Sequence, residues 1–234
     1  MACKGWMVVI WLAAAPLVVL GQDNQLTAKE KEEGWELLFD GKTTTGWMTP
    51  RRKALAASHV QEGALNPHPT DYMLTHEKEW GDFVLGLDFK ISPKCNSGVF
   101  IRTSPLEAMV GKDVGFNGLE IAIDDTKTNG YHDTGALYDL AKPSRNAMKP
   151  VGEWNRLVLT CKGPKISVEV NGALVNSIDL DKFDKVGLRP DGSQHKFGNA
   201  TRSHPRIGFI GLQDHGSDCW YKNIKAKRLA APTP

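Results

Sequence analysis

The 234-residue sequence has few cysteines, almost no excess of either charge and no long segment with helical periodicity. Its four cysteines are scattered, and none has the spacing of a metal knuckle. The 29 Lys and Arg residues nearly match the 27 Asp and Glu residues, and the two signs are interspersed, so neither nucleic acid nor an anionic membrane is an expected partner. No 3.6-residue hydrophobic period lasts long enough for the crossover helix of a parallel α/β sheet.

The one long hydrophobic run is at the N-terminus. Lys4 is followed by an apolar run from Trp6 to Leu20, and small Gly21 precedes a polar segment. This order is typical of a secretory signal peptide, and the run is short for a membrane span of about 20 apolar residues. We expect residues 1–21 to be removed, which would leave a secreted or periplasmic protein with no membrane insertion. An uncleaved anchor is the alternative.

Cleavage would leave three cysteines, which are Cys95, Cys161 and Cys219. An odd number in an oxidising compartment allows at most one disulfide, so a disulfide framework is not expected. The remaining chain has the length of a single all-β domain. We expect an N-terminal arm at 22–33 and one domain at 34–230.

Short strands separated by Gly, Pro, Asn and Asp dominate this domain, as is typical of all-β proteins. Asn171-Gly172 between two apolar runs is a strong hairpin signal. The pattern predicts a two-sheet antiparallel sandwich of the jelly-roll type. The expected strands are 35–39, 59–61, 72–74, 83–91, 97–103, 118–124, 135–138, 155–162, 165–170, 173–178, 206–213 and 220–229.

Alternation along a strand separates the core side chains from those on the opposite face. In 118–125, Leu119, Ile121 and Ile123 form a core face, while Glu120 and Asp124 flank small Ala122 on the other. If strands 83–91, 97–103 and 118–124 are neighbours in one sheet, their non-core faces share one surface. That surface would carry Asp88, Lys90, Arg102, Glu120 and Asp124. A concave substrate-binding face and a merely solvated outer face both fit this pattern.

A second polar cluster ends the strand predicted at 206–213. Gln213, Asp214 and His215 follow one another there, and ionisable groups at the rim of a sheet are frequently functional. A polar hairpin turn is the structural alternative. The loop 188–204, rich in Gly, Asn, Ser and His, is a candidate lid or specificity loop.

Several segments, taken in order, resemble the 3-keto-disaccharide hydrolase domain family over nearly the whole mature chain. They include GWELLFDGK at 34–42, WGDF at 80–83, NSGVFIR at 96–102, GLEI at 118–121, TGALY at 134–138, KPVGEWN at 149–155 and GLQDHG at 211–216. The resemblance implies a concanavalin A-like jelly roll, secretion in bacteria and action on oxidised sugars. The sequence departs from the family at Ala122, where the family usually has Gln.

The spacing of carboxylates argues against an ordinary glycosidase on this strand alone. The Cα atoms of Glu120 and Asp124 would lie roughly 13 Å apart at about 3.3 Å per residue. Glycosidase carboxyl groups lie about 5–9.5 Å apart. A 3-keto sugar permits another route, because its ketone acidifies the hydrogen on carbon 2. One base can remove that hydrogen, and the enolate then expels the glycosidic oxygen from carbon 1 before water adds.

This route needs a base, a stabiliser of the enolate and an acid for the leaving group. The sequence leaves Glu120 and His215 open as the base. Lys90, Arg102 or a divalent ion would stabilise the enolate, and Tyr138 or Asp214 would assist the leaving group. The expected substrate-binding residues are Arg102, Asp88, Asp124, Tyr138, Asn96 and Gln213.

Metal ligands and partners are less well defined. Asp124, Asp125 and His132 are candidates for a divalent cation, although they lack the spacing of a dedicated calcium loop. The chain has no dinucleotide fingerprint, so the dehydrogenase that oxidises the sugar must be a separate protein. Trp47, Trp80, Trp154 and Trp220 could stack on sugar rings, and at least two of them are expected in the core. A carbohydrate-binding module without catalysis is the alternative function.

Overall fold

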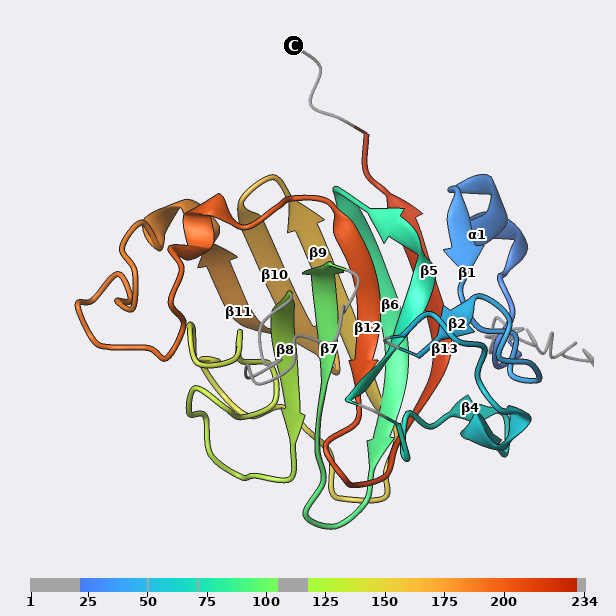
Figure 1. Ribbon diagram of the computed structural model, residues 1–234. Coiled ribbons are helices and arrows are strands. Elements are labelled where there is room, and N and C mark those ends of the chain that lie inside the picture. Colours follow the sequence, from blue (N-terminus) through green and yellow to red (C-terminus); the bar gives the residue numbers. More distant parts are fainter. Residues whose placement is uncertain (1–21, 50, 71, 105–117, 231–234) are drawn as a thin grey trace, which may run out of the picture.

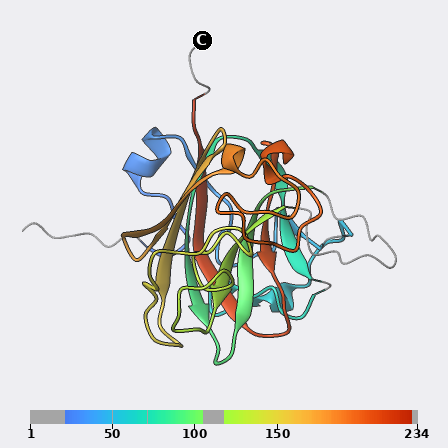
Figure 2. The same ribbon diagram turned by 90° about the vertical axis from the view of Figure 1, so that its left-hand side faces the viewer.

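The computed structural model describes residues 22–49, 51–70, 72–104 and 118–230. The predicted signal peptide at 1–21 lies outside the described residues. Within those ranges, no helix has the length and apolar character needed to cross a membrane. The chain folds as two antiparallel sheets packed face to face, with few helices (Figures 1 and 2). The predicted all-β sandwich is therefore confirmed.

The large sheet has the strand order β11-β10-β9-β6-β13-β4-β3, and β1 pairs with β13 off this path. Its strands are β1 (Trp35–Leu37), β3 (Val60–Gln61), β4 (Ala64–Leu65), β6 (Phe83–Ile91), β9 (Asn155–Lys162), β10 (Lys165–Val170), β11 (Ala173–Asp179) and β13 (Cys219–Arg228). The small sheet has the order β2-β5-β12-β7-β8. Its strands are β2 (Trp47–Met48), β5 (Met73–Trp80), β7 (Asn96–Thr103), β8 (Leu119–Asp124) and β12 (Gly208–Gln213).

Helices are short and lie at the margins of the sandwich. Helix α1 (Ala28–Glu32) starts with a capping box, in which Thr27 and Glu30 satisfy each other's backbone N–H groups. It lies beside β1 at one edge of the large sheet (Figure 1). Three single turns of 3₁₀ helix are η1 (Ala57–His59), η2 (Leu180–Lys182) and η3 (Thr201–Ser203).

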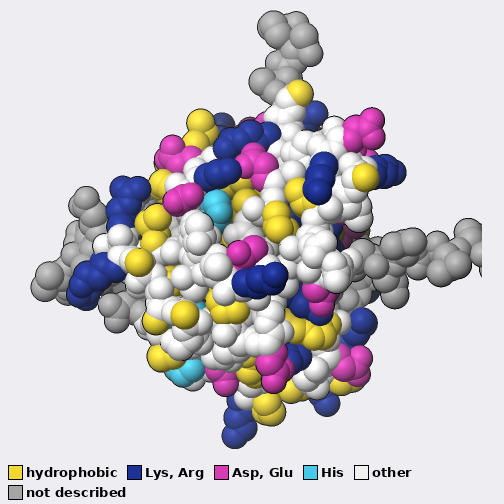
Figure 3. Space-filling view, turned by 90° about the vertical axis from the view of Figure 1, so that its right-hand side faces the viewer, with side chains coloured by type: hydrophobic (Ala, Val, Ile, Leu, Met, Phe, Trp, Pro, Cys, Tyr) yellow, Lys and Arg dark blue, Asp and Glu magenta, His cyan; other side chains and the backbone are white. Residues whose placement is uncertain are grey.

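The core fills the space between the two sheets. Leu85 and Leu159 of the large sheet and Val99 and Ile121 of the small sheet belong to one buried cluster. Trp47 and Trp80 are buried in the same cluster, which confirms that two of the four candidate tryptophans belong to the core. Among the described residues, Cys95, Cys161 and Cys219 are buried free thiols. On the surface, acidic and basic side chains are interspersed, as one face of the molecule illustrates (Figure 3).

Most predicted strands are present, and 83–91, 155–162 and 165–170 have the predicted bounds. The segment 135–138 forms no strand, although Leu137 makes isolated bridges to Ile121 and Ala141. One prediction about strand neighbours is wrong. β6 pairs with β9 and β13 in the large sheet, whereas β7 and β8 pair in the small sheet. Their non-core faces therefore point to opposite sides of the sandwich.

Candidate functional site

The outer face of the small sheet brings ionisable groups together over a floor of small residues. Across β7 and β8, Phe100 lies opposite Glu120, Gly98 opposite Ala122, and Asn96 opposite Asp124. On the next strand, Gly211 of β12 lies opposite Phe100. Gly98, Ala122 and Gly211 contribute little side-chain volume to this face. The side chains of Glu120, Gln213 and Asp124 lie beside them. We refer to this surface as the small-sheet site.

Glu120 is a buried carboxyl group that faces away from the core. Glu120 is only 6% exposed. Its chain neighbours Leu119 and Ile121 point to the other side of the strand and pack into the core cluster. The side chain lies across Gly98, where a Cβ atom would come within 2.7 Å of Glu120 Oε1. Burial raises the pKa of Glu120 to about 8, although the charge of Lys196 and a hydrogen bond with Gln213 lower it. The carboxyl group is therefore mostly protonated at pH 7.

Lys196 provides the positive charge at the small-sheet site. Its Nζ lies 3.4 Å from the hydroxyl of Tyr138 and 4.5 Å from the centroid of that ring. The His132 ring stacks on the Tyr138 ring, and the two ring centroids are 4.6 Å apart. The loop that carries Lys196 is fixed by Asp139, which accepts hydrogen bonds from the Lys196 backbone N–H (2.8 Å) and from Arg189 (2.6 Å).

Gln213 has a buried amide oxygen that no other described residue contacts by a hydrogen bond. The residue is 4% exposed, and its amide oxygen has no hydrogen-bond partner among the described residues. A buried acceptor without a partner is costly. Gln213 lies at the end of β12, opposite Met73 of β5.

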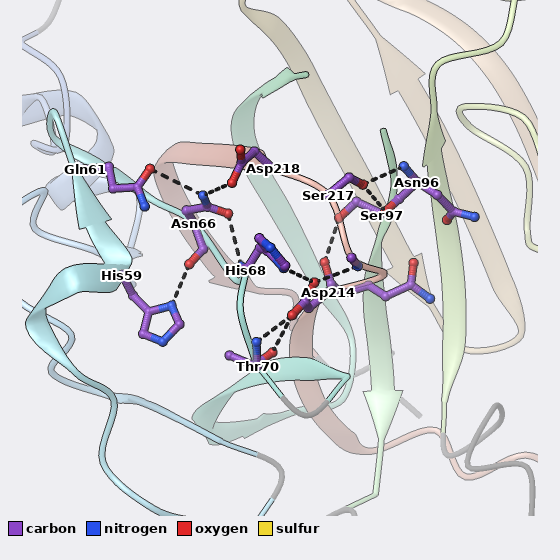
Figure 4. A network of polar contacts seen from close by, with 12 residues as sticks. His59, Gln61, Asn66, His68, Thr70, Asn96, Ser97, Asp214, Ser217 and Asp218 are labelled. Atoms are coloured by element: carbon purple, nitrogen blue, oxygen red, sulfur yellow. Dashed lines mark hydrogen bonds and ion pairs between the residues drawn. The ribbon is translucent and has the colours of Figure 1, made fainter. Parts of the chain in front are cut away.

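Asp214 holds a loop in place rather than facing an open site (Figure 4). Its Oδ1 contacts His68 Nδ1 at 3.0 Å and accepts from the Gly216 N–H at 2.9 Å. Its Oδ2 accepts from the backbone N–H of Thr70 at 2.5 Å. Both carboxylate oxygens are therefore occupied by the protein, and the predicted role in leaving-group assistance does not suit this geometry.

His215 and Asn96 both lie at the same end of the small-sheet site as Asp124. Burial and the charges of Asp133 and Asp125 raise the pKa of Asp124, and nearby His132 and His215 lower it. His215 is exposed. The backbone of Asn96 exchanges hydrogen bonds with the Ser217 hydroxyl, which ties this end of β7 to the loop after β12 (Figure 4).

Lys90, Asp88 and Arg102 do not face the small-sheet site. Lys90 and Asp88 lie on the outer face of the large sheet, because β6 belongs to that sheet. Asp88 binds Arg156 there at 3.1 Å. Arg102 has a φ of +51° at an irregular position of β7, and its side chain turns toward the other sheet. It is fully buried, donates to the carbonyls of Gly81 and Gly163, and pairs with Asp82.

The candidate metal ligands contact other protein groups and do not converge on one point. Asp125 accepts a hydrogen bond from the backbone N–H of Lys94 at 2.7 Å. His132 stacks on Tyr138 and lies 3.7 Å from Asp139. In the part of the chain that the structure describes, no three His, Cys, Asp or Glu side chains converge as metal ligands. The role of a divalent cation stays a prediction.

A jelly-roll sandwich with ionisable groups on one sheet face is compatible with a carbohydrate-active hydrolase and with a carbohydrate-binding module, so the fold alone does not decide the function. Residues 34–227 match the 3-keto-alpha-glucoside-1,2-lyase-like domain family, and the chain belongs to this family. It is 22% identical over 229 residues to a 3-keto-disaccharide hydrolase of Bacteroides thetaiotaomicron, an alignment that covers 84% of this chain and 79% of that protein. The predicted family and hydrolase class are thereby confirmed.

Two solved structures from Parabacteroides distasonis, both named for an inferred glycosyl hydrolase activity, are similar to this chain. One has a TM-score of 0.67 at 29% identity and covers 83% of this chain and 99% of its own. The other has a TM-score of 0.73 at 24% identity and covers 89% of this chain and 100% of its own. The second likeness concerns the fold, and the first also supports a glycosyl hydrolase-like role.

Proposed function

We propose that this protein is a secreted or periplasmic enzyme that cleaves 3-keto-glycosides by elimination across carbons 1 and 2, followed by hydration. The observation that carries the proposal is the buried carboxyl of Glu120, which lies on the outer face of the small sheet near the charge of Lys196 and near the amide oxygen of Gln213, which has no partner among the described residues. Membership of a family named for 1,2-lyase activity on 3-keto-glucosides supports this chemistry. A separate sugar 3-dehydrogenase would supply the substrate.

Glu120 is the proposed general base. Its carboxylate takes the proton from carbon 2, and the electron pair of that C–H bond forms an enolate with the carbon-3 ketone. Collapse of the enolate restores the ketone, forms the double bond between carbons 1 and 2, and expels the glycosidic oxygen. Water then adds to carbon 1 while carbon 2 regains a proton, so the net reaction is hydrolysis. A carboxylate with a raised pKa is a stronger acceptor for the proton of a weak carbon acid.

Lys196 is the proposed stabiliser of the enolate, in place of Lys90 and Arg102. Its ammonium group attracts Glu120 and lies beside Tyr138, so a ketone oxygen between these groups would meet a positive charge. A preorganised cation aimed at developing negative charge lowers the barrier most in a site that excludes water. The Tyr138 hydroxyl is the proposed donor to the departing oxygen.

Incubation of the purified protein with a 3-keto-disaccharide tests the proposal. We expect catalytic release of a reducing sugar, and incorporation of deuterium at carbon 2 when the reaction runs in deuterated water. The same incubation after treatment with a chelator determines whether a divalent cation is required. Stoichiometric binding without product release would contradict the proposal and identify a carbohydrate-binding module.

The pH dependence distinguishes a base from an acid. Because only the ionised form of Glu120 can accept a proton, kcat/KM should rise with pH and reach half of its maximum near the pKa of about 8. Lys196→Gln removes a positive charge that lowers this pKa, so its midpoint should move to higher pH. Uncatalysed elimination is measured at each pH and subtracted. A rate that falls through pH 8 would instead make Glu120 the acid.

A further inference from the structure

A cavity lies on the outer face of the large sheet, on the opposite side of the sandwich from Glu120. It has a volume of about 270 Å³, and we refer to it as the tryptophan pocket. Its walls are Gln61, Glu62, Ala64, Lys90, Trp154, Trp220 and Lys222. Trp220 and Lys222 alternate along β13 with buried Cys219 and Tyr221, which places them on the face away from the core.

Two indole rings and two ammonium groups converge in this pocket. Lys90 Nζ lies 5.2 Å from the centroid of the Trp154 ring and 4.8 Å from that of Trp220. Lys222 Nζ lies 4.4 Å from the Trp154 centroid. Trp220 Nε1 donates to Gln61 Oε1 at 2.8 Å, which fixes the plane of that indole. The rings are only partly buried, so they keep contact area for a ligand.

The polar groups of the tryptophan pocket include both free donors and a free acceptor. Lys222 is neutralised by Asp23 at 2.6 Å, but Lys90 has no ion pair with any described residue. Glu62 likewise makes no hydrogen bond or ion pair within the described ranges. A ligand whose groups both donate and accept hydrogen bonds fits this wall. The mixture of a cation and a carboxylate favours a neutral ligand over an anion.

Glu62 also occupies a strained backbone position. It forms the two-residue turn between β3 and β4 with Gly63, and the φ angles of the two residues are +49° and +77°. Such turns favour Asn, Asp or Gly at the first position, because a longer side chain is disfavoured there. The turn places Glu62 among the residues that line the pocket.

We infer that the tryptophan pocket is a second carbohydrate-binding site, which takes a hexose unit of a neutral oligosaccharide and performs no chemistry. The indoles would contact the apolar C–H face of the sugar, and Lys90 and Glu62 would bind its hydroxyl groups. Aromatic contact surface with a few placed polar groups is the usual composition of a small-ligand pocket. A site on the opposite sheet would let the protein hold a glycan while the small-sheet site remains accessible.

Titration calorimetry with unoxidised maltotetraose and cellotetraose tests this inference. We expect saturable binding of at least one of them, and a loss of affinity of about tenfold or more in Trp154→Ala and in Trp220→Ala. Trp35→Ala is the matched control, because Lys225 and Lys227 lie over that ring in the same way, 5.9 and 5.2 Å away, but it lies outside the pocket. Glu120→Gln should bind with unchanged affinity.

A second variant keeps the test decisive if the tryptophan variants fold poorly. Glu62→Asn suits the positive φ, so it should fold at least as stably as the wild type, yet bind more weakly because its side chain is shorter and uncharged. A tetragalacturonate serves as the anionic comparison ligand. Four results would overturn the inference: no binding of either neutral tetrasaccharide, binding of the tetragalacturonate alone, an equal loss of affinity in Trp35→Ala, or full affinity in Glu62→Asn. Because no 3-keto sugar is used, these outcomes are independent of the proposed reaction.

Discussion

Replacing Glu120 with Gln is expected to lower kcat for a 3-keto-disaccharide by about 10²–10⁴-fold, the range typical of a lost general base. The amide is nearly isosteric with the carboxyl group, so it can occupy the same space across Gly98. It cannot accept a proton from carbon 2. Deuterium exchange at carbon 2 should therefore slow by the same factor as product release, as measured by NMR in deuterated water.

Stability provides a second readout for the same variant. The folded-state pKa of Glu120 is raised from 4.5 to about 8, so its stabilising contribution is present below pH 4.5 and is lost as the pH rises through 8. Ionised Glu120 consequently destabilises the folded protein in alkaline solution. Glu120→Gln removes this penalty. The free energy of unfolding of the variant at pH 9 should therefore exceed that of the wild type by roughly a few kcal/mol. Loss of activity with a gain of stability is the mark of a functional group rather than a structural one.

His215→Asn is the companion variant, because the sequence leaves His215 as the other candidate base. His215 lies near Asp124 rather than beside Lys196. Its replacement should alter kcat/KM by no more than about tenfold and leave the carbon-2 exchange mainly intact, since general-base removal costs more. If exchange slows in His215→Asn and proceeds normally in Glu120→Gln, the assignment of the base is reversed.

The sequence predicts the faces of single strands well, because alternation is a local property. In β8 it separates Glu120 and Asp124 from Leu119 and Ile121, and the structure agrees. Strands 83–91 and 155–162 are likewise predicted to the residue, because each alternates strongly and is bounded by turn residues. The glycine-rich end of β12 also predicts that Gln213 lies at a sheet rim. These inferences need no knowledge of distant contacts.

Properties that depend on distant contacts could not be predicted in this way. The partner strands of β6 are set by long-range pairing, so the local pattern does not separate Lys90 from Glu120. Arg102 follows the alternation until its φ of +51° redirects the side chain, and nothing in the local pattern signals that bend. Lys196 was missed because it lies in a loop without periodicity. Its position depends on Asp139, 57 residues away in the sequence.

Replacing Arg102 with Met is expected to lower the free energy of unfolding by about 3–5 kcal/mol, the usual effect of removing one partner of a buried ion pair. The guanidinium is fully buried and pairs with Asp82 at 3.2 Å. It also donates to Gly163 O at 2.8 Å, so it joins the small sheet to the turn between β9 and β10. Methionine fills much of the same volume, but it removes the donor to the Gly81 and Gly163 carbonyls and leaves Asp82 Oδ1 with the Gly163 N–H and no positive charge. Urea unfolding at pH 7 measures the difference.

Arg156→Met is the matched control for this prediction. Arg156 pairs with Asp88 at 3.1 Å, a distance similar to that of the Arg102 pair, but its side chain is 34% exposed. Solvent screens that pair, so its loss should change the free energy of unfolding by no more than about 1 kcal/mol. Arg102→Met that remains folded should keep its KM for the 3-keto-disaccharide, because Arg102 points away from the small-sheet site. A large rise in KM with little loss of stability would restore Arg102 as a substrate-binding residue.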